Sequence, residues 1–189
     1  MALAHLKVVG DYLANPDAYD LGERVAIIGM GNSAMDVART VIRHGAREVT
    51  LYARGLASNA SEHETAYARL DGAAFEFGKQ IAEITDDGPV FENILYDEEG
   101  NQTGVDEKME QIYADSTIIS ISQGPKSKLV NTTEGLKASP NGLLMTDENG
   151  QTTIPGIFAS GDVVLGARTV VEAAAYSKVV AEAMDEYMG

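Results

Sequence analysis

A short glycine-rich run, Gly29-Met30-Gly31-Asn32-Ser33-Ala34, carries the clearest chemical signal in the sequence. Its pattern is G-x-G-x-x-A, and it lies between an apolar run of strand length, Arg24–Ile28, and a helical pattern that begins at about Ser33. In that context the first glycine permits a tight turn, the second leaves room for a pyrophosphate, and the alanine allows close helix–strand packing. The N–H groups at the helix start would face the phosphates. The run predicts a dinucleotide-binding turn; the alternative is a glycine turn without a ligand.

The end of the next predicted strand bears on which dinucleotide binds. An NAD site places Asp or Glu there to hold the ribose hydroxyls, whereas this chain reads Tyr52-Ala53-Arg54-Gly55. The planar guanidinium of Arg54 is suited to the 2′-phosphate of NADP. The alternative is an arginine in a solvated loop.

A second signal lies near the C-terminus, where Gly156-Ile-Phe-Ala-Ser-Gly-Asp162 is followed by Thr169-Val-Val-Glu-Ala173. A strand that ends in Gly-Asp before a helix start would place one carboxylate and several N–H groups at a single point. The residues alone do not say what binds there, and a structural turn explains the pattern equally well.

Catalytic side chains and metal ligands are not predicted. No Ser/His/Asp set or acid–base pair stands out, and the three histidines are scattered. This pattern fits hydride transfer, in which the cofactors carry the chemistry and the protein positions them.

Composition excludes several classes of partner. The 189 residues carry a net charge of -15, from 14 Lys and Arg against 29 Asp and Glu, which argues against nucleic acid and anionic membranes. The absence of cysteine excludes disulfides, thiolate nucleophiles and iron–sulfur ligation within these residues. No apolar run approaches the length of a membrane span, so a soluble cytoplasmic protein is expected.

The elements that position these signals alternate between strand and helix patterns. In order, we expect a helix over Ala2–Ala14, strands at Arg24–Ile28 and Glu48–Ala53 around the helix Ser33–His44, a helix over Glu62–Leu70 capped by Ser61, a strand at Phe75–Phe77, an antiparallel meander over 79–114, a strand at Ser116–Ile121, short strands at Leu143–Met145 and Gly156–Ser160, and a helix over Thr169–Tyr187. The predicted fold is α/β: a Rossmann-like parallel sheet with helices on both faces and an inserted meander, plus a C-terminal strand–helix segment.

Two motifs of this sequence resemble motifs that occur together in one protein family. Gly156–Ala173 resembles the C-terminal flavin motif of the two-dinucleotide-domain flavoprotein oxidoreductases, and Val25–Asp36 with Arg39–Ala46 resembles their NADP-binding domain. The branch most similar is the small chain of NADPH-dependent glutamate synthase and its relatives, over about residues 3 to 187. After a leading helix and linker over 1–23, which the residue pattern predicts, the resemblance implies an NADP-binding domain over 24–128 and the C-terminal segment of an FAD-binding domain over 129–189.

The resemblance also implies roles for individual residues. The turn at 29–34 would meet the NADP pyrophosphate, and Arg54 the 2′-phosphate. Asp162 would hydrogen-bond the ribityl–phosphate chain of FAD, and the amides near Val170 and Val171 would face the flavin's pyrimidine end. The implied cofactor-binding residues beyond the turn are Arg54, Gln123, Gly161, Asp162, Thr169, Val170 and Val171.

The sequence departs from the family pattern at three places. Ser122 stands for a glycine in the Ile-Gly-Gln-x-Pro pattern, Tyr176-Ser177 for the Gly-Arg of the last helix, and Ala53 for a second arginine beside Arg54. The family's first flavin-binding G-x-G-x-x-G turn and its electron-entry cysteines are not found within these residues.

The expected function is that of an NADPH-dependent oxidoreductase portion, which binds NADP(H) and presents its hydride to FAD. Because the FAD site within this chain is incomplete, the chain alone is expected to be inactive. Its expected partner is the remainder of a flavin domain or a partner subunit. The apolar faces at 3–13 and 169–187 would otherwise pair with each other or favour self-association. The alternative is a non-catalytic nucleotide-binding module that acts through a partner protein.

Overall fold

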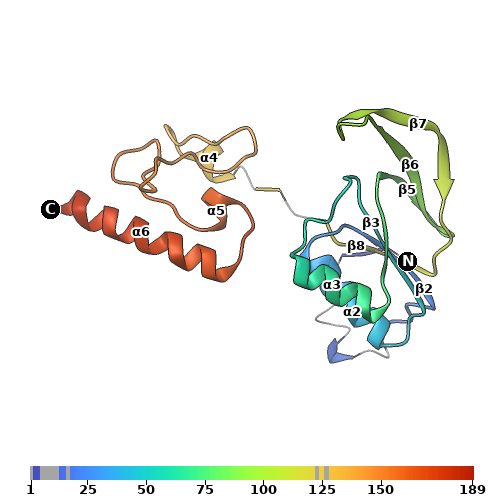
Figure 1. Cartoon of the computed structure of the whole chain (residues 1–189). Coiled ribbons are helices and arrows are strands. Elements are labelled where there is room, and N and C mark those ends of the chain that lie inside the picture. Colours follow the sequence, from blue (N-terminus) through green and yellow to red (C-terminus); the bar gives the residue numbers. More distant parts are fainter. Residues whose placement is uncertain (1, 5–12, 16–17, 122–123, 126–127) are drawn as a thin grey trace. The chain divides into compact units, whose positions relative to one another are not determined.

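The computed structural model describes residues 2–4, 13–15, 18–121, 124–125 and 128–189 (Figure 1). Gln123, one of the predicted cofactor-binding residues, lies outside the described residues. The chain divides into two compact units, Met1–Ser122 and Gln123–Gly189.

A five-stranded parallel sheet forms the centre of the first unit. Its order is β1-β8-β2-β3-β4, and every neighbouring pair is parallel. The strands are β1 (Ala2–Ala4), β2 (Arg24–Ile28), β3 (Glu48–Tyr52), β4 (Ala74–Glu76) and β8 (Ser116–Ile119). Strand β2 lies between β3 and β8, with Ala26 opposite Thr50 on one side and Thr117 on the other. This confirms that the two buried apolar runs belong to one sheet.

Two helices cover one face of this sheet (Figure 1). Helix α2 (Asn32–Arg43) follows β2, and α3 (Glu62–Asp71) follows β3. Their inward residues share a core with β2, β3 and β8 that includes Ile27, Leu51 and Ile118, none of which is exposed to solvent. The hydroxyl of Ser61 accepts a hydrogen bond from the N–H of Glu64, which confirms the predicted cap of α3.

The opposite face of the parallel sheet packs against a three-stranded antiparallel sheet. This meander consists of β5 (Lys79–Thr85), β6 (Gly88–Tyr96) and β7 (Gln102–Gln111), in the order β5-β6-β7. Phe91 of β6 is fully buried and stacks on Tyr52 of β3 with 4.6 Å between ring centroids. The α/β class and the meander are confirmed; within the described residues the meander occupies the face where the sequence predicted further helices.

The predicted helix over Ala2–Ala14 is wrong at its start. Ala2–Ala4 form β1, which pairs in parallel with β8, although Leu3 and Leu13 have helical spacing. A short apolar segment is ambiguous between helix and strand, and pairing with the free edge of a buried strand decides it here. Residues 5–12, in the middle of the predicted helix, are outside the described residues, and Leu13 and Ala14 at its end are helical.

The second unit contains less regular structure than the sequence predicted. Its helices are α4 (Lys128–Thr132), α5 (Asp162–Leu165) and α6 (Val170–Met188). The strands expected at Leu143–Met145 and Gly156–Ser160 are reduced to isolated bridges. Glycines with positive φ at 142, 150 and 156 interrupt these segments before a ladder can extend. In the described part of the chain no helix is long and apolar enough to cross a membrane.

Candidate nucleotide-binding site

The turn between β2 and α2 requires glycine at its first position. Gly29 has φ +126°, and a Cβ there would lie 2.1 Å from the carbonyl oxygen of Ser120, which follows β8. Its N–H donates to the carbonyl of Tyr52 at 2.9 Å. Gly29 therefore lies between the ends of β3 and β8 and lets the chain turn tightly at the carboxyl edge of the sheet.

The second glycine of the turn is not required by the protein's own packing. Gly31 is the N-cap of α2 with φ −94°, which any residue adopts, and a Cβ there would meet nothing within 4 Å among the described residues. The open space adjoins the first turn of α2, where the N–H groups of Asn32 and Ser33 have no acceptor within the helix. By contrast, Ala34 is fully buried and allows the helix to approach the sheet.

The loop after β3 is tied to the glycine turn. The carbonyl of Met30 accepts hydrogen bonds from the N–H groups of Asn59 and Ala60 and from the hydroxyl of Ser58, at 3.0, 3.2 and 3.0 Å. Met30 and Asn32, both predicted to bind a cofactor, thus direct an oxygen each to the protein itself, since the side-chain oxygen of Asn32 accepts from the N–H of Ser61 at 2.8 Å. These contacts leave the backbone N–H of Asn32, at the first position of α2, as a donor for a phosphate.

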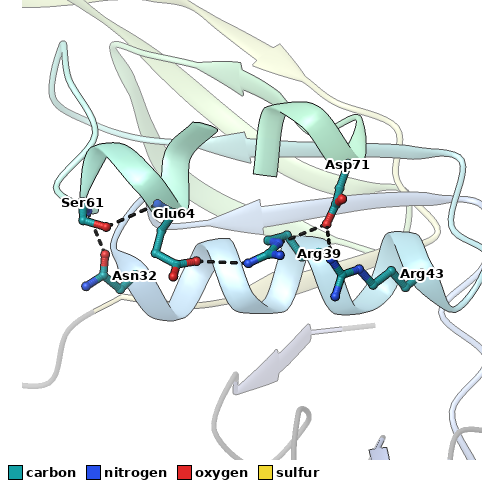
Figure 2. A network of polar contacts seen from close by, with 6 residues as sticks. All are labelled: Asn32, Arg39, Arg43, Ser61, Glu64 and Asp71. Carbon is teal, nitrogen blue, oxygen red and sulfur yellow. Dashed lines mark hydrogen bonds and ion pairs between the residues drawn. The ribbon is translucent and has the colours of Figure 1, made fainter. Parts of the chain in front are cut away.

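Two arginines join α2 to α3, as Figure 2 shows. Arg39 pairs with Glu64 at 3.2 Å and with Asp71 at 3.0 Å, and Arg43 pairs with Asp71 at 2.9 Å. These pairs fix the helix that begins at the turn against the helix that follows the loop. Beside them, burial and then the carboxylate of Glu64 raise the pKa of Asp36, while Arg39 opposes the shift.

Arg54 lies in the loop that follows β3, and its side chain is exposed. Its Nη2 donates to the side-chain oxygen of Gln102, the first residue of β7, at 2.9 Å. Its carbonyl accepts from the hydroxyl of Tyr96 at 2.5 Å. The structure thus places the predicted phosphate-binding arginine at the same sheet edge as the turn, and adds a partner that sequence analysis did not find.

The start of α6 is organised by a local cap. The Thr169 hydroxyl accepts from the N–H of Glu172 at 3.3 Å, and the Glu172 carboxylate accepts from the Thr169 N–H at 3.0 Å. Hydrogen bonds from Thr169 and then from Arg168 lower the pKa of Glu172 to about 2. The side chain of Thr169, a predicted cofactor ligand, is therefore engaged within the protein.

Other predicted flavin-binding groups in the second unit point to solvent. Val170 and Val171 are 85% and 78% exposed, and their N–H groups are the first two of α6. Gly161 caps the short helix α5 with φ +75°, and Asp162 opens that helix on the surface. Arg168 donates through Nε to the carbonyl of Leu165, which holds the end of α5 near the start of α6.

The residues present fit a dinucleotide at the first unit and part of a flavin site at the second. The open space at Gly31, the first N–H groups of α2 and the exposed guanidinium of Arg54 match a pyrophosphate and a further phosphate. In the second unit, the carboxylate of Asp162 suits a ribityl chain, and the N–H groups of Val170 and Val171 suit the edge of a flavin. The Glu172 carboxylate adds negative charge beside these N–H groups.

Comparison with known proteins shows the family of the chain. A sequence profile described as pyridine nucleotide-disulphide oxidoreductase matches residues 5–178. The chain belongs to this family. The small chain of NADPH glutamate synthase from Halomonas elongata is 33% identical over 182 residues, which cover 88% of this chain and 39% of that protein. The beta subunit of NADP(+)-dependent formate dehydrogenase from Moorella thermoacetica is 30% identical over 185 residues, 88% of this chain and 25% of that protein.

Solved structures show the same fold. Thioredoxin reductase from T. acidophilum aligns with a TM-score of 0.73 at 20% identity and covers 99% of this chain and 58% of the reductase. The chain thus spans less than two thirds of the length of each of these three proteins. The resemblance to a family of oxidoreductases that includes the small chain of glutamate synthase, inferred from the sequence, is confirmed.

Proposed function

We propose that the chain binds NADP(H) at the Gly29–Ala34 turn, as the pyridine-nucleotide part of a flavoprotein oxidoreductase. The observation that carries the proposal is Gly31. Neither its φ nor any neighbouring described atom requires glycine, yet the open space that glycine leaves adjoins the N–H groups that begin α2. A pyrophosphate is the group that such a space and such donors suit.

The chain's own residues would bind and orient the nucleotide. The N–H groups of Asn32 and Ser33 would donate to the pyrophosphate, and Arg54 would pair with the 2′-phosphate. No acid follows β3, since its end reads Tyr52-Ala53-Arg54, which favours NADP(H) over NAD(H). Bound there, the nicotinamide nucleotide would supply a hydride for a flavin.

The second unit would contribute one end of the FAD site. Asp162 and the N–H groups of Val170 and Val171 are exposed and suited to this role. Thr169 would act indirectly, because its cap sets where α6 begins. Gln123 and Gly161 complete the proposed cofactor-binding set.

The proposal includes a partner and a cellular location. The partner is the remainder of a flavin domain or a separate subunit, in the cytoplasm. Relatives named as a small chain and as a beta subunit support a multi-subunit assembly.

Nucleotide titration with Arg54→Ala tests the NADP assignment. We expect a loss of NADPH affinity of roughly 1.5–3 kcal/mol, as for a charge-assisted hydrogen bond, and no loss for NADH. Arg47→Ala is the matched control, because it removes the same charge from an exposed arginine at the opposite edge of the sheet. Unchanged NADPH affinity in Arg54→Ala, or equal affinity of the parent for both nucleotides, would reject the assignment.

An absorbance spectrum tests the flavin part of the proposal. With a single nucleotide-binding turn within the 189 residues, the chain should purify colourless and show no diaphorase activity with added FAD. A ligand held by part of its contacts still loses its translational and rotational freedom, so its affinity is poor. A stoichiometrically yellow chain that oxidises NADPH would show that these residues form a complete flavoenzyme.

A further inference from the structure

Arg54 differs from every other arginine in how its charge is partnered. The chain holds 29 acidic residues against 14 basic ones, and five of the seven arginines pair with a carboxylate: Arg24, Arg39, Arg43, Arg47 and Arg168. The guanidinium of Arg69 lies over the ring of Phe75. Arg54 donates to the neutral amide oxygen of Gln102, and among the described residues no carboxylate lies within ion-pair distance of it.

Two carboxylates of the acidic turn that precedes Gln102, those of Asp97 and Glu99, bond within the turn. Asp97 accepts from the N–H groups of Glu99 and Asn101 at 3.0 and 2.8 Å and from the side-chain amide of Asn101 at 3.2 Å. These bonds lower the pKa of Asp97, with the backbone bond from Asn101 as the largest cause. The side-chain amide of Asn101 also donates to Glu99 at 3.4 Å. The side chain that Arg54 contacts after this turn is thus the neutral amide of Gln102.

Hydrogen bonds to the carbonyls of residues 53–55 fix the meander against the loop that carries Arg54. The hydroxyl of Tyr96 donates to the carbonyl of Arg54. The N–H of Gly78 donates to the carbonyl of Gly55 at 3.3 Å, and the N–H of Lys79 donates to the carbonyl of Ala53 at 2.9 Å. Gln102 is thus held at a defined place relative to the end of β3, although 48 residues separate it from Arg54.

We propose that Gln102 is a specificity-determining positioning residue, which orients the Arg54 guanidinium for a ribose 2′-phosphate without neutralising its charge. The inference rests on the proposed nucleotide site and extends its specificity from the loop after β3 to the meander. A guanidinium has five N–H donors, so one bond to an amide oxygen leaves a fork for a phosphate. An acid at position 102 would instead compete with the phosphate for the same donors.

Two substitutions separate orientation from charge. Gln102→Glu keeps size and acceptor but adds a carboxylate beside Arg54, and we expect it to weaken NADP⁺ binding by about tenfold or more through the lost charge-assisted contact. Gln102→Leu removes the acceptor and keeps the bulk. It should weaken NADP⁺ binding by about two- to tenfold, because an unrestrained arginine must then be ordered on binding. Both variants should bind NAD⁺ as the parent does.

Calorimetric titration of the 189-residue chain with NADP⁺, NAD⁺ and adenosine 2′,5′-bisphosphate gives the readout. Lys108→Gln is the charge control for Gln102→Glu, since it also lowers the net charge by one at an exposed position of β7. Gln102→Leu is repeated in an Arg54→Gln background, where we expect it to have no effect on NADP⁺ affinity. Circular dichroism confirms that each variant is folded.

The outcomes distinguish this inference from the function on which it rests. Loss of the NADP⁺ preference in both Gln102 variants, with Lys108→Gln unchanged and no further effect in the Arg54→Gln background, supports it. An unchanged ratio of NADP⁺ to NAD⁺ affinity in both variants overturns it and leaves the nucleotide site standing. A parent chain that binds none of the three probes overturns the proposed function as well.

Discussion

The two units support the N-termini of their candidate binding helices, α2 and α6, in different ways. In the first unit, the turn before α2 adjoins a core whose central side chains, Ile27, Leu51 and Ile118, are fully buried. In the second unit, the described apolar side chains with little exposure are only Leu136, Leu144 and Val180, and α6 buries one residue in its 19. Its start is set by the Thr169–Glu172 cap. A site built on a core is preorganised by long-range packing, whereas a site built on a cap depends on local hydrogen bonds.

Gly29→Ala should produce the largest effect and should confine it to the first unit. The Cβ would overlap the carbonyl of Ser120 and occupy a φ of +126°, so we expect a loss of about 3 kcal/mol or more in the free energy of unfolding. Gly45→Ala is the control, because its φ is also positive but nothing lies within 4 Å among the described residues. Hydrogen exchange resolved by unit is the measurement. Equal losses in both variants would show that backbone strain, not the close approach to β8, requires Gly29.

Val180→Ala should act on the second unit alone. Val180 is 4% exposed, and removing its two methyl groups should cost about 2 kcal/mol. Val179→Ala, at a 46% exposed neighbour on the same helix, should cost far less. If exchange in residues 24–121 rises as much as in α6, the two units do not unfold independently, and the contrast between them fails.

Gly31→Ala should separate binding from stability. Because a Cβ there meets nothing and φ is −94°, the free energy of unfolding should change by less than about 1 kcal/mol. Affinity for NADP⁺ and NAD⁺ should fall together, by about tenfold, because both share the pyrophosphate that the methyl group would displace. Parallel denaturation and calorimetry measure the two quantities. A stable variant that retains parental affinity would remove the main support for the site.

The smallest effect concerns the pH dependence of α6. The pKa of Glu172 falls from its ordinary 4.5 to about 2 in the folded chain, so its cap stabilises α6 fully above about pH 4.5. This stabilisation is lost as the pH falls from 4.5 towards 2. Circular dichroism measures the helicity of the parent and of Glu172→Gln. The difference between the two should decrease as the pH falls through that window. A difference that stays constant down to pH 2 would contradict the role of the ionised carboxylate.

Sequence patterns predicted the parts of the fold that depend on neighbours in the chain. The apolar run at 24–28, the glycine turn and the Ser61 cap each encode their structure within a few residues, and the structure has them as β2, the start of α2 and the N-cap of α3. The predicted binding roles of these residues stay predictions, which the titrations above test.

Contacts between distant segments could not be predicted. Leu3 has helical spacing, yet β1 forms because the edge of β8 offers it a partner. Gln102 meets Arg54 only through the register of β6 with β7, in which Tyr96 pairs with Gln102. Nothing in the local sequence around Gln102 signals that contact. The bridges at Leu144 and Phe158 likewise depend on how the glycine turns of the second unit fold together.

The three strands of the meander have a consequence for how the chain can vary. The chain leaves β4 at the carboxyl edge, where Lys79 bonds to Ala53, and must enter β8 at the amino edge, where Asp115 bonds to Arg24. An odd number of antiparallel strands carries it across, as a helix does in an ordinary crossover. Loss or gain of a whole hairpin preserves this parity, whereas loss of one strand would deliver β8 at the wrong edge and reverse it. Insertions and deletions in this segment should therefore come in pairs of strands.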